Sequence, residues 1–299
     1  LRLLYAQVPT EEGESVYALN REAGFRRCVE EALAGRRCEQ LLEKDDDCRQ
    51  IIASPVEQDG QIAGAVLVIL DVTEKEQRER LRREFTANVS HELKTPLTSI
   101  KGFTDMLASG MVASPEDQKR FITMIGVEVD RLIDLINDIL KLSELESVTI
   151  PQSEERSDVL TIARDTAAFL TPTAKAAEVT LSVDGGPATV AVPQGRLKEL
   201  LLNLVGNGIK YNEPGGTVRT AVSVRDGQAV IAVSDTGIGI PPEAQSRVFE
   251  RFYRVDKGRS RKQGGTGLGL SIAKEIIDRH QGVLELADKE GPGLAVRMG

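Results

Sequence analysis

Two long stretches with a helical apolar repeat constrain this chain more than any other feature of its sequence. Apolar residues recur at steps of three and four between positions 81 and 107, and again between 122 and 139. Gly110 ends the first helix, and Ser114 with Pro115 begins the second. Residues 75–147 are therefore predicted to form a helical hairpin. Because two helices alone bury little apolar surface, we expect a second copy of the chain to complete a four-helix bundle.

The segments on either side of the hairpin have mixed helix and strand patterns. We predict helices at 15–34, 158–176, 194–211 and 267–280, three antiparallel strands within 36–73, strands at 178–184, 217–224 and 228–235, and final strands near the end. Residues 149–158 are polar and are predicted to be a linker. The part after it alternates helices with strands, which is typical of an α/β layer domain.

Charge and composition exclude some partners and leave others open. The formal net charge of the 299 residues is −8, which argues against a nucleic-acid partner. The longest apolar run, residues 62–70, is too short to cross a bilayer, and because the chain begins at Leu1 we expect a piece of a longer protein. The three cysteines, Cys28, Cys38 and Cys48, indicate no disulfide framework, so we expect ordinary thiols in a reducing compartment.

One of only two histidines lies in the first long helix, within "SHELKTPL". At about 100° per residue His91 is about 200° from the centre of the apolar stripe, so it faces water, where a neutral imidazole is an available nucleophile. Glu92 is positioned to hold or accept its proton, and Thr95 follows one turn later on the same face. A lone surface histidine is usually only a solvated polar residue, so this feature needs support from elsewhere in the chain.

That support comes from polar residues of the α/β part. Asn203 and Asn207 are four residues apart, on one face of a predicted helix, where two amides suit a hydrated Mg²⁺ ion and phosphate oxygens. Lys210 is within reach of a phosphate. The alternative is a solvated polar helix face. Asparagine is a poor helix former, however, so two asparagines on one helix face indicate a specific role.

Two glycine-containing loops complete the pattern. "DTGIGIP" places Asp235 at a strand end, where it can accept a hydrogen bond from an exocyclic amine, and its glycines let the backbone approach a flat ring. "GGTGLGLSIAKEI" is a glycine-rich loop that opens a helix, an arrangement that favours a polyphosphate. Neither loop has the spacing of a dinucleotide-binding fingerprint or of a P-loop.

Taken in order, these segments resemble the successive boxes of bacterial sensor histidine kinases, most closely the phosphate-sensing and cell-wall-sensing subgroup. The matching segments are "FTANVSHELKTPLTSIKGF", "NLVGNGIKYN", "DTGIGIPPE", "FERFYRVD" and "GGTGLGLSIAK". They lie within residues 75–299. Residues 1–74 resemble the end of a PAS sensor domain, and they are too few for a whole one. Gln281, Gly208 and the final "GPGLAVRMG" depart from the family pattern.

The resemblance implies roles for individual residues. His91 is the implied phosphoacceptor, Glu92 the base and Thr95 a phosphatase residue, although a threonine before Pro96 can also simply bond to a preceding carbonyl. Asn207 is the implied Mg²⁺ ligand, and residues 249–264 the implied ATP lid. The implied ATP-binding residues are Asn203, Asn207, Lys210, Tyr211, Asp235, Gly237, Gly239, Gly265, Thr266, Gly267, Leu268 and Gly269.

The expected architecture is an α+β multidomain chain. Its parts are a partial PAS-like α/β domain (1–74), a dimeric helical-hairpin phosphotransfer domain (75–148), a linker (149–158) and an α/β sandwich ATP-binding domain of the histidine kinase/Hsp90-type fold (159–299). The resemblance implies ATP and Mg²⁺ as cofactors, a homodimer, and the receiver domain of a response regulator as partner. It also implies a cytoplasmic fragment whose intact receptor reaches the membrane through an upstream segment. The alternatives are a nucleotide-switched ATPase of the same fold and a catalytically idle scaffold.

Overall fold

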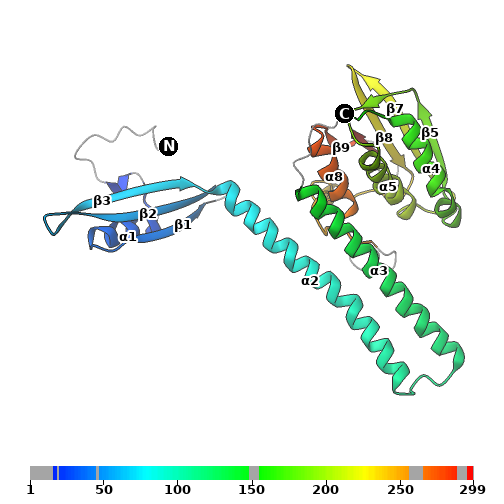
Figure 1. Ribbon diagram of the computed structural model, residues 1–299, viewed down its shortest axis with the longest axis horizontal. Helices are drawn as coiled ribbons and strands as arrows, with labels where there is room; N and C mark the ends of the chain where they lie inside the picture. Colours follow the sequence, from blue (N-terminus) through cyan, green and yellow to red (C-terminus); the bar gives the residue numbers. More distant parts are fainter. Residues whose placement is uncertain are drawn as a thin grey trace. The chain divides into compact units, whose positions relative to one another are not determined.

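The computed structural model describes residues 16–18, 20–44, 47–147, 155–255, 265–287 and 295–298 (Figure 1). The chain divides into two compact units, Leu1–Asn88 and Val89–Gly299. The long helix α2 (Thr73–Ala108) begins in the first unit and ends in the second.

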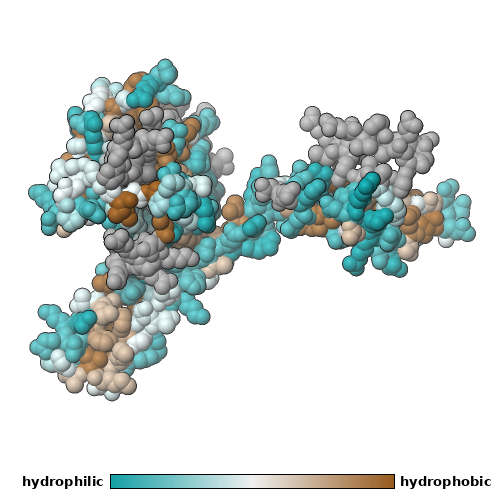
Figure 2. Space-filling view, turned by 180° about the vertical axis from the view of Figure 1, so that it is seen from behind, coloured by the Kyte–Doolittle hydropathy of each residue, from teal (hydrophilic) through white to brown (hydrophobic). Residues whose placement is uncertain are grey.

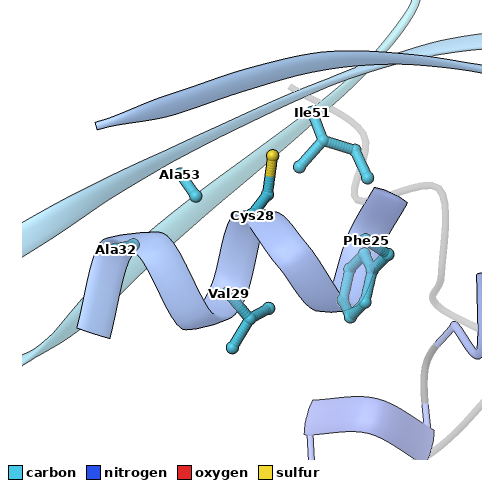
Figure 3. Packing of buried hydrophobic residues seen from close by; sticks show 6 residues of the cluster. All are labelled: Phe25, Cys28, Val29, Ala32, Ile51 and Ala53. Atoms are coloured by element: carbon cyan, nitrogen blue, oxygen red, sulfur yellow. The ribbon is translucent and has the colours of Figure 1, made fainter. Parts of the chain in front are cut away.

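The first unit is a helix on a three-stranded antiparallel sheet, as the sequence predicts. Its elements are η1 (Val16–Ala18), α1 (Ala23–Leu33), β1 (Cys38–Lys44), β2 (Asp47–Gln58) and β3 (Gln61–Asp71). The strands lie in the order β1-β2-β3, and α1 packs on one face. A small core joins helix to sheet (Figure 3): it contains Phe25, Cys28, Val29, Ala32, Ile51 and Ala53.

Two predictions for this unit are wrong. The helix predicted at 15–34 is a 3-10 turn followed by a separate helix, α1. The expectation of three ordinary thiols fails because Cys28 of α1 and Cys38 of β1 form a disulfide, with Cα atoms 5.1 Å apart. Cys48 is the free thiol among the described residues. Cysteine spacing missed this bond because the chain reverses after α1 and brings the start of β1 beside the helix.

The hairpin helices are confirmed, with α3 extending from Pro115 to Ser147. Gly110 has φ +72°, a left-handed conformation that ends α2, and the backbone N–H of Asp117 donates to Ser114 Oγ at 3.4 Å. Phe103 and Phe121 meet edge to face across the hairpin, with ring centroids 5.6 Å apart. No described helix combines the length and the apolar character needed to cross a membrane.

The rest of the second unit is a mixed sheet with helices packed on it. Its elements are β4 (Ser157–Asp158), α4 (Val159–Ala176), β5 (Thr180–Gly185), β6 (Thr189–Val190), α5 (Gln194–Lys210), β7 (Thr217–Arg225), β8 (Gln228–Asp235), α6 (Pro242–Gln245), α8 (Gly269–Arg279), β9 (Leu284–Ala287) and β10 (Ala295–Met298). The sheet order is β5-β7-β8-β10-β9, and among these described strands β5 and β7 are the parallel pair. The neighbouring helices α4, α5 and α8 pack against it (Figure 1).

The core of this layer follows from the apolar faces of the predicted elements. Helix α5 buries a stripe spaced three and four residues apart, and the strands bury alternate residues. Representative buried side chains are Leu197, Leu200, Leu201, Leu204, Val218, Val222, Ile231, Val233, Ile272 and Ile276.

The predicted linker is wrong at its end, since Ser157 and Asp158 pair with β6 as strand β4. Asp158 then caps α4 by accepting the backbone N–H of Leu160 at 3.0 Å. The departure at Gln281 also has a structural consequence. Its φ is +57°, so a non-glycine residue occupies a left-handed turn that glycine adopts at lower cost.

Candidate functional site

The structure places the candidate residues in two groups, one around His91 on α2 and one where α5 meets two glycine-containing loops. The His91 side chain is 70% exposed, as the stripe predicted, and its Nδ1 lies 3.9 Å from Glu92 Oε1. The other carboxylate oxygen of Glu92 accepts a hydrogen bond at 3.3 Å from Arg131 Nη2 of α3. Arg131 is only 12% exposed, so it fixes the carboxylate beside the imidazole.

Thr95 lies one turn after His91. Its Oγ1 donates to the carbonyl oxygen of His91 at 3.2 Å, which is the bond that a purely structural role requires. Pro96 follows inside α2 and is buried. Because proline has no backbone N–H, the helix loses one internal hydrogen bond directly after the histidine. The hydrogen bond of the Thr95 hydroxyl and the missing backbone donor of Pro96 together distinguish the hydrogen bonding of this turn from that of a regular α-helix.

The second group forms where the end of α5 meets the glycine-rich loop before α8. A methyl group placed on Gly265 would lie 3.0 Å from Tyr211 Oη and 3.2 Å from Lys210 Nζ. One placed on Gly269 would lie 3.0 Å from Asn203 Oδ1 and 3.7 Å from Asn207 Nδ2. Four polar side chains of α5 and its C-terminal cap therefore line the space against which this loop packs.

Asp235 and its loop approach the same end of α5. The Asp235 carboxylate is buried at the end of β8, and its Oδ1 accepts the backbone N–H of Gly237 at 2.9 Å. A Cβ at Gly237 would clash with the carbonyl oxygen of Tyr211, so only glycine fits there. Gly239 has φ +68°, which also favours glycine. The loop thus needs its glycines to pass close to α5.

The glycine-rich loop is shaped by backbone contacts. Gly267 has φ +75°, and its carbonyl oxygen accepts the backbone N–H of Phe252 at 2.9 Å. Leu268 is fully buried and precedes the first residue of α8. Thr266 Oγ1 accepts the backbone N–H of Leu268 at 3.2 Å. The part of the predicted lid at 256–264 lies outside the described residues.

Two residues near these groups were missed by the sequence reasoning. Arg131 lies on α3, 39 residues after Glu92, and Asp138 of α3 accepts a hydrogen bond from Thr266, 128 residues away. Neither residue stands out within a heptad-like helix that is rich in charged residues. Only the pairing of distant segments reveals them.

Asn203 presents an amide oxygen to the glycine-rich loop, a group that a hydrated Mg²⁺ ion can take as a ligand, whereas the Asn207 atom nearest to Gly269 is its Nδ2. The Asn203 amide donates from Nδ2 to the carbonyl oxygen of Glu199 at 3.0 Å, which turns its Oδ1 toward Gly269 at the start of α8. An amide oxygen is a ligand that Mg²⁺ takes, and the phosphate oxygens that the ion also binds are anions of the kind that a helix N-terminus favours.

Comparisons with known proteins identify the two parts of the chain that contain these groups. Residues 81–148 match the model of the "His Kinase A (phospho-acceptor) domain", and residues 193–298 match that of the "Histidine kinase-, DNA gyrase B-, and HSP90-like ATPase". The "Sensor histidine kinase WalK" of Bacillus subtilis (strain 168) is 37% identical over 265 residues, which are 85% of this chain and 43% of that protein. The chain thus spans less than half the length of that relative.

Solved structures give the same result. The full-length ShkA structure in complex with AMPPNP is 28% identical, with a TM-score of 0.51, over 72% of this chain and 45% of that one. The histidine kinase ThkA in complex with response regulator protein TrrA has a TM-score of 0.58 over 96% of this chain and 85% of that one, and at 23% identity it supports the fold alone. From the two matched domains, the WalK relative and the ShkA structure, we conclude that the chain belongs to the bacterial sensor histidine kinases of two-component systems.

Proposed function

We propose that this chain transfers the γ-phosphoryl group of ATP to His91 and then to an aspartate of a response regulator. The observation that carries the proposal is the exposed imidazole of His91 beside a carboxylate that Arg131 holds in place. Incubation with γ-labelled ATP and Mg²⁺ tests it, and the chain is expected to retain the label.

The residues around His91 suit a nucleophilic attack. The Glu92 carboxylate lies 3.9 Å from Nδ1, so in this proposal the proton of the neutral imidazole is on Nδ1 and the lone pair is on Nε2. Nε2 attacks the γ-phosphorus, the bond to the β–γ bridging oxygen breaks, and ADP leaves. The Nδ1 proton is held or accepted by Glu92. Arg131 acts as a positioning residue, because it touches Glu92 and not the imidazole.

The nucleotide belongs at the end of α5. Buried Asp235 is the proposed acceptor for the adenine amine, with Gly237, Gly239 and Tyr211 shaping the ring pocket. Lys210, Gly265, Thr266, Gly267, Leu268 and Gly269 form the proposed phosphate side, with Asn207 as the Mg²⁺ ligand and Asn203 beside it. A bound Mg²⁺ ion would neutralise charge that develops on the phosphates.

The domain boundaries and partners follow from the same proposal. Residues 75–148 are the proposed dimerisation and phosphotransfer domain, 159–299 the ATP-binding domain, and 1–74 a partial PAS-like sensor. The proposed protein substrate is the receiver domain of a response regulator, which would dock beside the exposed His91. ThkA was solved in complex with a response regulator protein, and we place the intact receptor at the cell membrane as part of this proposal.

The proposed dimer seam consists of Ile122, Ile125, Val129, Leu132, Ile136 and Ile139. Ile122, Val129 and Ile136 are exposed in the single chain, and hydrophobic residues gather at the turn end of the hairpin (Figure 2). Such a surface favours a second copy.

Leu132→Asp is therefore expected to give monomers, because a charge in a helical seam has no partner. Light scattering after size exclusion measures this change. Val127→Asp is the control, since Val127 is exposed about 200° away from both Ile125 and Val129 and should leave the dimer intact. A dimeric Leu132→Asp variant would place the contact elsewhere.

Thr95→Ala is expected to keep autophosphorylation and phosphotransfer but to slow dephosphorylation of the regulator by roughly tenfold or more, about 1.4 kcal/mol. The Thr95 hydroxyl lies about 40° around the helix from His91, where it would position water against a phospho-aspartate. Thr98→Ala is the matched control, because exposed Thr98 makes the same bond to the carbonyl oxygen of Lys94 at 2.8 Å. If the rates of autophosphorylation, phosphotransfer and dephosphorylation all fall together with the melting temperature, the role of Thr95 is only structural, through its bond to the His91 carbonyl oxygen.

A further inference from the structure

The glycine-rich loop before α8 forms a side-chain hydrogen bond with helix α3. Thr266 Oγ1 donates to Asp138 Oδ2 at 2.7 Å, while the same oxygen accepts the backbone N–H of Leu268 at 3.2 Å. The Leu268 N–H thus donates to the Thr266 hydroxyl, which in turn donates to the Asp138 carboxylate. A negative group of α3 thus engages the loop that the proposed function assigns to the phosphates of ATP.

Further contacts join the same part of α3 to α8 and to neighbouring charged residues. Leu142 and Leu145 are each 1% exposed, and α3 packs against α8. Glu146 Oε1 accepts from Arg251 Nη2 at 2.6 Å, and Glu144 pairs with Arg196 at 3.4 Å. We call Asp138, Leu142, Leu145 and Glu146 the docking face of α3. These contacts hold the Asp138 carboxylate against the loop.

Several charged side chains act on Asp138 and on Lys210. Burial raises the pKa of the Asp138 carboxyl above its usual range, and the nearby Asp134 and Glu199 act in the same direction, against the bond from Thr266 and the attraction of Lys141. Asp138 and Asp134 also act on Lys210, whose pKa is lowered mainly by burial and then by Arg254. Because Asp138 is bonded to Thr266 and acts with Asp134 on Lys210, a polyphosphate held by Thr266 and Lys210 would meet the like charge of Asp138. The cations Arg254 and Arg131 act on Lys210 in the opposite sense to these carboxylates.

We propose that Asp138 is an autoinhibitory latch that stands in for the phosphates of ATP, so that docking of α3 and full binding of the nucleotide exclude each other. The inference rests on the proposed function, which places Thr266 and Lys210 on the phosphate side. Entry of the polyphosphate displaces the carboxylate and releases the docking face. Release frees the ATP-binding domain to move relative to α3, which carrying a phosphate to His91 requires.

Binding of AMPPNP·Mg²⁺, measured by calorimetry on the whole chain, tests the latch. Removing a competing carboxylate raises the fraction of binding-competent molecules, so Asp138→Ala and Asp138→Asn should bind roughly fivefold tighter or more. Asp130→Asn is the control, because Asp130 is exposed two turns earlier on α3, and its affinity should match that of the unaltered chain. Affinity that is unchanged or weaker in both Asp138 variants overturns the latch.

A second measurement needs no variant. Hydrogen exchange at the amides of residues 142–146 should accelerate when AMPPNP·Mg²⁺ is added, because the end of α3 loses its packing. Unchanged or slower exchange, with binding established by calorimetry, contradicts the latch and leaves the nucleotide site in place. An unaltered chain that does not bind AMPPNP at all would instead overturn the proposed function, and the latch with it.

Discussion

His91→Gln is expected to abolish incorporation of phosphate from ATP, by roughly 1000-fold or more, while the affinity for AMPPNP stays unchanged. Glutamine keeps a polar side chain on the exposed face of α2 but has no nucleophilic nitrogen. The imidazole is 70% exposed, so its removal leaves no cavity and should not alter folding. Labelling with γ-labelled ATP and calorimetry on the same preparation separate chemistry from binding.

His280→Gln is the matched control for this prediction. His280 follows α8 as its C-terminal cap, and its Nδ1 lies 2.7 Å from the carbonyl oxygen of Ile276. Its ring is engaged with the helix end and is part-buried, so this variant should still be labelled. Full labelling of His91→Gln, or loss of label in His280→Gln with normal nucleotide binding, would move the phosphoacceptor away from His91.

Asn207→Ala is expected to remove most of the Mg²⁺-dependent part of nucleotide binding. The loss of a ligand from a half-buried polar site costs about 1–3 kcal/mol, so the affinity for AMPPNP·Mg²⁺ should fall roughly tenfold or more. Binding without Mg²⁺ should change much less, because the proposed adenine contact at Asp235 is separate from the proposed metal site. Titrations with and without Mg²⁺ measure the two contributions.

Asn88→Ala serves as the control for Asn207→Ala. Asn88 is an exposed asparagine on α2, so its removal tests the effect of losing an amide outside the nucleotide site. Its affinity for AMPPNP·Mg²⁺ should equal that of the unaltered chain. Equal Mg²⁺ dependence in Asn207→Ala and in the unaltered chain would remove Asn207 from the metal site.

Long periodic elements of this fold were predictable from the sequence, and short pairings were not. Helices α2 and α3 follow from apolar steps of three and four, and their ends from Gly110 and Ser114. The two-residue strands β4 and β6 have no periodicity to read, so their pairing was missed. The Cys28–Cys38 bond depends on how α1 folds onto the sheet, which spacing does not record.

Some residues of the candidate site were likewise predictable from the sequence, and others were not. Its glycines stand out in the sequence, and in the structure Gly237 and Gly269 each lie close to residues at the end of α5. Arg131 and Asp138 were not found, because each acts through a partner on a distant segment. Ordinary charged residues on an exposed-looking helix give no indication of such partners in a single sequence.

The chemical nature of the phosphate that the chain retains tests the central claim most directly. After incubation with ATP and Mg²⁺, the label should be lost in acid and kept in base, as a phosphoramidate requires, and peptide mapping should place it on His91. Label that survives acid, or that maps to a hydroxyl, a carboxylate or His280, would contradict the proposed histidine kinase activity.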